Sequence, residues 1–298
     1  MTSTMRPASA ERFELLRALA TLCERPDPSH GVIGAALGLQ APALPEEHTA
    51  VFVLQCHPHA SCYLSSDGML GGEAGDRVAG FWRALGLEPP AAPDHLAALL
   101  GLYTALGVEA CGPASGEAAR AGLEHAREAL FWEHLASWAP ALLAAVSGAG
   151  STLFTAWAEL LGSALAAEAE AAHPPSRLPL ALRQAPGPPA LDSGAAAMLD
   201  AVLAPARSGV VLTRGRLLGA ARGLGVGSRQ GERRFMLQAM LDQDTTGTLG
   251  WIAGEAARWA ELHRRWMPAE AGIRSWWTDR AAATAGVFET LARRTNRR

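Results

Sequence analysis

The stretch PDHLAALLGLYTALG, residues 93–107, decides the fold class, because its apolar residues recur with the period of an α-helix. One stripe of such a helix would hold Leu96, Leu99, Leu100, Tyr103 and Leu106. Asp94 stands where an N-cap is expected, and Gly107 stands where a helix commonly ends. The stretch therefore predicts a buried helix.

The same period continues downstream. A helix is expected from about residue 117 to Trp138, where Pro140 permits only a kink or a new start, and another from about Ser151 to Ala171. The only clearly β-branched run is TAVFVL at residues 49–54, which is too isolated to build a sheet. These patterns predict an all-α fold.

Six prolines between residues 172 and 192 exclude a long helix there and mark a hinge or linker. Helical patterns then resume, with Thr213 as an N-cap, a helix over Gln230 to Leu241, and Thr245 or Thr246 capping a longer helix. We therefore expect a helical domain at 1–175, a proline-rich linker at 176–194 and a basic helical extension at 195–298.

The charge differs between the two parts of the chain. Residues 1–194 carry 10 arginines and 20 acidic residues, whereas residues 195–298 carry 16 arginines and 9 acidic residues. An acidic part can steer a basic peptide, and a basic part can steer phosphates or an acidic protein surface. The simpler interpretation is two solvated surfaces.

The 298-residue chain is 49% hydrophobic, without an uninterrupted apolar run of membrane-spanning length. Charged residues interrupt the first 25 positions, so we expect no signal peptide and a cytoplasmic protein that does not insert into a membrane. The four cysteines form no disulfide framework and are expected to be free thiols.

The segment QCHPHASCYL, residues 55–64, raises the question of a metal site, because Cys56, His57, His59 and Cys62 lie close together. Structural zinc sites usually combine two ligand pairs, and no second pair stands at metal spacing here. Cys111 and His95 could join only through the tertiary fold. Since catalytic and nucleotide-binding motifs are also missing, we expect no metal, no cofactor and no enzyme activity, with a metal-dependent enzyme as an open alternative.

A second alternative is a helix-turn-helix DNA-binding regulator formed by residues 206–241. Gly223 to Gly227 would form its turn, and Arg229, Arg233 and Arg234 would face phosphates. The apolar character of the second helix, FMLQAML, argues against a polar reading face.

Four segments, in this order, resemble the TorD/DmsD/NarJ family of cytoplasmic chaperones for molybdopterin oxidoreductases. The resemblance covers about residues 45–175, and its segments are PHASCYLSSDGMLGGE, FWRALGLEPPAAPDHLAALLGLYTALG, LFWEHLASWAPALL and LFTAWAELLGSAL. It implies a TorD-like helical bundle that binds the twin-arginine signal peptide of an apoenzyme and keeps the enzyme competent for cofactor insertion. The added C-terminal region has no implied role.

The resemblance also implies the residues of a signal-peptide groove. They are Pro58, Ser61, Tyr63 and Leu64 of the first segment, Glu88, Pro93, Asp94 and His95 of the second, and Trp132 and Trp138 of the third. An acidic residue that the family usually carries after the second motif is missing, because Ala98 to Gly101 occupy its place.

A receptor for a twin-arginine signal needs an apolar groove for its helix and carboxylates for its guanidinium groups. Further wall candidates are Leu100 and Tyr103, and the candidate carboxylates are Glu73, Asp76, Glu88 and Asp94. The expected partner is the apo catalytic subunit of a molybdopterin oxidoreductase with its signal peptide. No nucleic acid is expected, and the protein could be a monomer or a dimer.

Overall fold

The computed structural model describes residues 7–39, 44–112, 116–228 and 231–297, and every named element in these ranges is a helix. The all-α prediction is confirmed. An isolated bridge between His59 and His95 is the only β-type pairing in the described part. The elements are α1 Pro7–Leu22, α2 Pro28–Ala36, α3 Leu44–His48, η1 Thr49–Val53, α4 Ser61–Leu64, α5 Gly72–Ala84, α6 Leu96–Ala110, α7 Glu117–Ala129, η2 Leu130–Leu135, α8 Ala139–Ser147, α9 Thr152–Ala171, α10 Leu180–Gln184, α11 Ala195–Leu203, α12 Pro205–Ser208, α13 Arg214–Leu224, α14 Arg233–Gln243, α15 Thr245–Trp266, η3 Glu270–Gly272 and α16 Ile273–Thr295.

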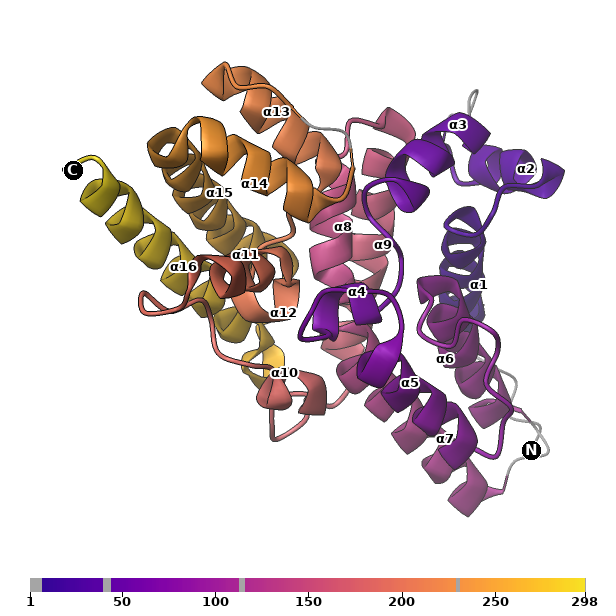
Figure 1. The fold of residues 1–298 in the computed structure, drawn as a ribbon. Coiled ribbons are helices and arrows are strands. Elements are labelled where there is room, and N and C mark those ends of the chain that lie inside the picture. The colour runs from indigo at the N-terminus through magenta and orange to yellow at the C-terminus, as the bar shows by residue number, and fades with distance from the viewer. Residues whose placement is uncertain (1–6, 40–43, 113–115, 229–230, 298) are drawn as a thin grey trace.

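Two adjacent helices, α8 and α9, run through the middle of the molecule (Figure 1). On one side α1 packs against α9, α6 against α1, and α7 against α6. On the other side α15 packs against α8, and α16 covers α15 along its length. The C-terminal helices thus extend the bundle that the N-terminal helices begin.

One hydrophobic cluster runs from Phe13 in α1 to Phe288 in α16, so the two parts of the chain share their core. The Trp277 indole N–H donates to the Ser137 carbonyl at 3.0 Å, which joins α16 to the segment between η2 and α8. Both residues are fully buried. The division into a domain, a linker and an extension stays a prediction about chain organisation, and the packing between the parts is continuous.

Of the expected N-caps, Thr213 is confirmed, and Asp94 and the pair Thr245 or Thr246 are wrong; Ser151, expected near the start of a helix, is also an N-cap. Ser151 accepts from the Phe154 N–H, and Thr213 accepts from the Arg216 N–H. At α6, however, the cap is His95, whose Nδ1 accepts from the Ala97 N–H at 3.1 Å, because the Asp94 carboxylate is bonded elsewhere. At α15 the cap is Asp244 rather than Thr245 or Thr246, since the Asp244 carboxylate accepts from the Gly247 N–H.

Gly107 does not end α6, which continues to Ala110. Its missing side chain serves packing instead, because a Cβ at this position would clash with the ring of Phe13 from α1. The glycine therefore allows α1 and α6 to approach closely.

Pro140 marks a new start, as expected. It occupies the first turn of α8, after η2 has widened the chain into a π-helix. The run at residues 49–54 joins no sheet and forms the π-helix η1.

The proline-rich segment holds only the short helix α10, which agrees with the exclusion of a long helix. Arg280 of α16 fastens it, since its guanidinium donates to the carbonyls of Ala185 and Pro186 and also to Ala206 at 2.9 Å. The same guanidinium lies 4.0 Å from the ring centroid of Trp276.

No single helix in the described ranges combines the length and apolar character needed to cross a bilayer. One bent pair, Glu117–Leu135 with Ala139–Ser147, meets the length and composition criteria jointly.

We predict that Gly107→Ala lowers the free energy of unfolding by about 2 kcal/mol, because the added methyl overpacks the contact with Phe13. Gly101→Ala in the same helix is the matched control, since no atom lies within 4 Å of its Cβ position. The control should be neutral or slightly stabilising through helix propensity. Urea denaturation measures both, and equal effects would contradict the packing role.

We also predict a pH dependence of stability from His263, which is fully buried and whose Nε2 contacts the Gly209 carbonyl at 2.7 Å. Burial lowers the pKa of His263 from 6.5 to about 4. The unfolded chain binds this proton near pH 6.5 and the folded chain does not, so folding stability falls as the pH drops from 7 to 5. The contribution is about 2 kcal/mol, and His263→Gln should remove it.

The exposed His125 supplies the control for this measurement. His125→Gln should keep the pH profile of the wild type. A His263→Gln variant with an unchanged slope between pH 7 and 5 would show that another group causes the dependence.

Candidate functional site

The segment from Val53 to Leu70 exposes apolar side chains for a local reason. After the short helix α4, the chain turns at Gly68, whose φ of +67° suits glycine. Asp67 holds this turn by accepting from the Ser65 hydroxyl at 2.8 Å and from the Met69 N–H at 3.0 Å. The turn leaves Met69 and Leu70 each 61% exposed at its tip.

The C-terminal part packs closely on this segment. A Cβ at Gly68 would lie 3.0 Å from the Leu203 carbonyl oxygen and 3.1 Å from the Ala204 Cα. A Cβ at Gly215, in the first turn of α13, would clash with the Gln55 side chain. Residues 53–70 and residues 200–215 are therefore neighbours, with backbone against backbone at Gly68 and a side chain against backbone at Gly215.

Between these two parts lies the largest of the described cavities, an open cleft of about 690 Å³ that we call the large groove. Its volume falls within the range of roughly 300–1,000 Å³ common for ligand pockets. Val53 and Leu54, about half exposed, stand at its edge with Met69 and Leu70. The apolar part of its lining comprises Val53, Leu54, Met69, Leu70, Leu203 and Val211.

The charged lining of the large groove is balanced. Its members are Asp67, Asp200, Glu232, Arg214, Arg233 and Arg234. Arg234 and Asp200 form an exposed ion pair with 2.7 Å between Nε and Oδ1. The Met69 N–H holds the pKa of Asp67 below its ordinary value, so this carboxylate is anionic at neutral pH.

Arg233 lies at the wall of the groove beside the segment that the sequence singled out. It is partly buried near Cys56, Cys62 and Tyr63, and its guanidinium donates to the Leu212 carbonyl at 3.1 Å. Burial raises the pKa of both thiols to about 12 and raises that of the Tyr63 phenol. These neighbours are therefore uncharged, and burial lowers the pKa of Arg233.

Five of the ten predicted site residues meet where two loops join. The Asp94 carboxylate accepts from the Ser61 N–H at 3.0 Å, and the Leu96 N–H donates to the Pro58 carbonyl at 2.8 Å. Asp94 is only 4% exposed. The five members of this loop junction are Pro58, Ser61, Pro93, Asp94 and His95.

The other five predicted residues lie in separate places. Tyr63 packs on Trp138 with ring centroids 5.3 Å apart, and an edge of Tyr63 lines the large groove. Leu64 lines a smaller neighbouring cavity that shares Asp67, Met69 and Leu70 with the groove. Trp132 is buried and donates to the His173 carbonyl at 2.8 Å, and Glu88 is exposed.

The remaining candidates divide between the core and the surface. Leu100 is fully buried, and the Tyr103 hydroxyl bonds to the buried carboxylate of Glu168. Glu73 and Asp76 are exposed, with 3.5 Å between Glu73 and Arg77. Sequence reasoning thus placed wall residues in positions that the fold uses for its core.

The cysteine prediction is confirmed, because all four cysteines are free. His59 and His95 pack edge to face with ring centroids 4.8 Å apart, beside Asp94. In the described ranges, no three His, Cys, Asp or Glu side chains gather closely enough to hold a metal ion.

The helices of the DNA-binding alternative are α13 and α14, but α14 begins at Arg233 rather than at Gln230. Arg233 is turned toward the Leu212 carbonyl, and Arg234 pairs with Asp200. Arg229 lies outside the described residues. Neither described arginine therefore stands free on an exposed helix face to meet phosphates.

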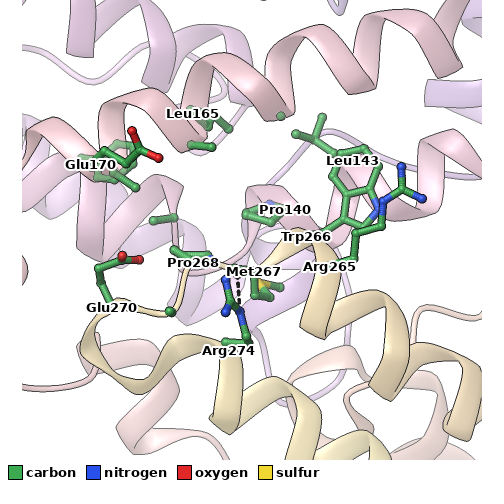
Figure 2. A pocket seen from close by; sticks show the side chains of 16 residues that line it. Pro140, Leu143, Leu165, Glu170, Arg265, Trp266, Met267, Pro268, Glu270 and Arg274 are labelled. Carbon is green, nitrogen blue, oxygen red and sulfur yellow. Dashed lines mark hydrogen bonds between the residues drawn. The ribbon is translucent and has the colours of Figure 1, made fainter.

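A second cavity lies where the α15–α16 connection meets α8 and α9 (Figure 2). Trp266 closes one side against α9, where a Cβ at Gly162 would lie 2.8 Å from the indole. Arg274 donates to the Met267 carbonyl at 2.8 Å across the floor of the cavity. With about 170 Å³, the cavity is too small for a peptide helix.

Residues 13–144 match the family model described as nitrate reductase delta subunit. This match covers less than half of the chain and supports the NarJ/TorD-type chaperone family for that part. Proteins of this family act as chaperones in the maturation of molybdoenzymes. Searches of curated proteins and of solved structures found no match.

Sequence reasoning missed Val53, Leu54, Met69, Leu70 and Arg233 as groove residues. The four apolar residues read as ordinary core or turn positions, because the groove that they line forms only where residues 200–234 approach the 53–70 segment. A signal was present in DGML at residues 67–70, where apolar side chains follow directly on a turn-forming Asp-Gly pair.

We predict that Asp94→Ala lowers the free energy of unfolding by about 2 kcal/mol, because it leaves the buried Ser61 N–H without its acceptor. Asp76→Ala is the control, since this carboxylate is exposed, and should stay within about 0.5 kcal/mol of the wild type. Chemical denaturation with circular dichroism tests both variants. A stable Asp94→Ala variant with altered peptide binding would instead favour a direct binding role.

Proposed function

We propose that this protein is a chaperone that binds the twin-arginine signal peptide of an apo molybdopterin oxidoreductase in the large groove. The family match over residues 13–144 supports the kind of client. The observation that carries the proposal is the exposed apolar lining of the groove, formed by Val53, Leu54, Met69 and Leu70.

The apolar lining suits the hydrophobic part of a signal peptide. Such a peptide forms a moderately apolar helix, and a helix of this kind lays its apolar face into a groove. Covering apolar surface contributes about 25 cal/mol per Å² before the cost of ordering the peptide. The result is moderate affinity, which suits a chaperone that must release its client.

The rim of the groove can receive guanidinium groups. Asp67 and Glu232 line it and are exposed, and neither forms an ion pair with a described residue. A carboxylate accepts two parallel hydrogen bonds from arginine, a geometry that lysine does not offer. These two acids replace the earlier candidates Glu73, Asp76, Glu88 and Asp94 as the proposed receivers.

The first test titrates a twin-arginine signal peptide and its Lys-Lys variant by isothermal calorimetry at low and moderate salt. We expect saturable, roughly micromolar binding of the twin-arginine peptide, several-fold weaker binding of the variant, and weakening of both by salt. The double variant Met69→Ser with Leu70→Ser should bind at least tenfold more weakly, because it removes two apolar contacts.

Val32→Ser is the matched control for the groove variant. Val32 is an apolar residue of α2 that is 73% exposed and does not line the groove. Its variant should bind as the wild type does. Absence of saturable binding by the folded wild type would refute the proposed function, and equal losses in both variants would move the site out of the groove.

A further inference from the structure

Arg233 and Arg214 are the two arginines of the large groove that form no ion pair with a described residue, and Arg233 is the one that lies beside the buried segment of Cys56, Cys62 and Tyr63. Its guanidinium has five N–H donors, and its single hydrogen bond in the described part is to the neutral Leu212 carbonyl. Arg234 beside it has a carboxylate partner in Asp200, whereas Arg233 forms no ion pair with a described residue. A partly buried cation without an anionic partner costs stability.

The position of Arg233 in its helix also costs stability. Arg233 and Arg234 are the first two residues of α14, whose first turn contains no acidic residue, while Glu232 stands before them at the N-cap. The helix dipole favours acidic residues at that end and disfavours basic ones. Arg233 is therefore placed against both the local helix preference and its partly buried surroundings.

The neighbours of Arg233 do not supply the missing charge. Cys56, Cys62 and Tyr63 stay protonated at neutral pH, because burial raises their pKa values. These three residues of the 55–64 segment thus place uncharged side chains near the guanidinium. None of these three neighbours supplies a negative group to the guanidinium, so an anion that enters the groove could pair with it.

We propose that Arg233 is the recognition point for a carboxylate, an Asp or Glu side chain carried within the apolar client segment that occupies the large groove. This inference rests on the proposed function and adds the chemistry of the client that the groove selects. The client segment would place apolar residues on Met69 and Leu70 and one acidic side chain on the guanidinium.

The lining favours a single carboxylate over a polyphosphate. Three acidic and three basic side chains line the groove, so its formal charge is balanced. A nucleoside triphosphate would bring several negative charges against Asp67 and Glu232 and would leave the apolar lining uncovered. An apolar helix with one carboxylate is complementary to both features, because the carboxylate can pair with the guanidinium and the apolar side chains can cover the apolar lining.

The test selects peptides from a display library of random 14-residue sequences on the wild type, on Arg233→Met and on Arg264→Met. Methionine keeps an apolar side chain and removes the charge. Arg264 is an exposed residue of α15 that pairs with Glu261, outside the groove, and controls for loss of a surface arginine. We expect apolar peptides with one central Asp or Glu from the wild type and from Arg264→Met, and loss of that acidic preference on Arg233→Met.

The selected peptide with the highest affinity is then titrated, together with a variant in which Gln replaces its acidic residue. We expect the acidic peptide to bind the wild type about tenfold more tightly than the Gln variant of the peptide does. Arg233→Met should bind both equally and should melt no lower than the wild type, because it removes an unpaired charge. A melting temperature that falls, together with an unchanged preference for the acidic peptide, would show that Arg233 is structural.

The outcomes separate this inference from the proposed function. Enrichment of apolar peptides without an acidic residue, equally on all three proteins, would overturn the carboxylate site and leave the peptide groove standing. No enrichment on any of them would overturn both. Saturable binding of GTP that is lost in Arg233→Met, without selection of acidic peptides, would assign the guanidinium to a phosphate instead.

Discussion

The close backbone approach between residues 53–70 and residues 200–215 is the constraint on which the rest of the molecule depends. Gly68 permits it, because a Cβ there would press on the backbone of Leu203 and Ala204, and Gly215 leaves room for the end of the Gln55 side chain. The approach brings α12 onto α4. It forms the large groove between residues 53–70 and residues 200–234. The groove therefore belongs to neither part of the chain alone, although the family match covers only residues 13–144.

The fold class and several helix boundaries could be predicted because they follow from local chemistry. Ser151 and Thr213 cap helices, and Pro140 starts one, through contacts within three or four residues. Two of the errors arose where a distant residue intervened. Asp94 bonds Ser61 instead of capping α6, and Gly107 accommodates Phe13 instead of ending the helix. Such long-range competition leaves no mark in the local pattern.

The candidate site could be predicted only in part, for the same reason. The resemblance singled out Tyr63 and its neighbours, and an edge of Tyr63 lines the groove. Trp132 and Trp138, by contrast, are buried. Their indole N–H groups donate hydrogen bonds to the carbonyls of His173 and His134. The exposed apolar residues Met69 and Leu70, and the arginine that faces the cysteine-rich segment, become visible only once the C-terminal helices are placed.

Hydrogen–deuterium exchange of the 298-residue chain, with and without a saturating twin-arginine signal peptide, tests whether both parts of the chain build the peptide site. Bound peptide is expected to slow amide exchange in two separate segments at once, residues 53–70 and the first turns of α14 from Arg233 onward. Protection confined to the loop at residues 88–95, with no change in the C-terminal segment, would contradict a groove built by both parts of the chain.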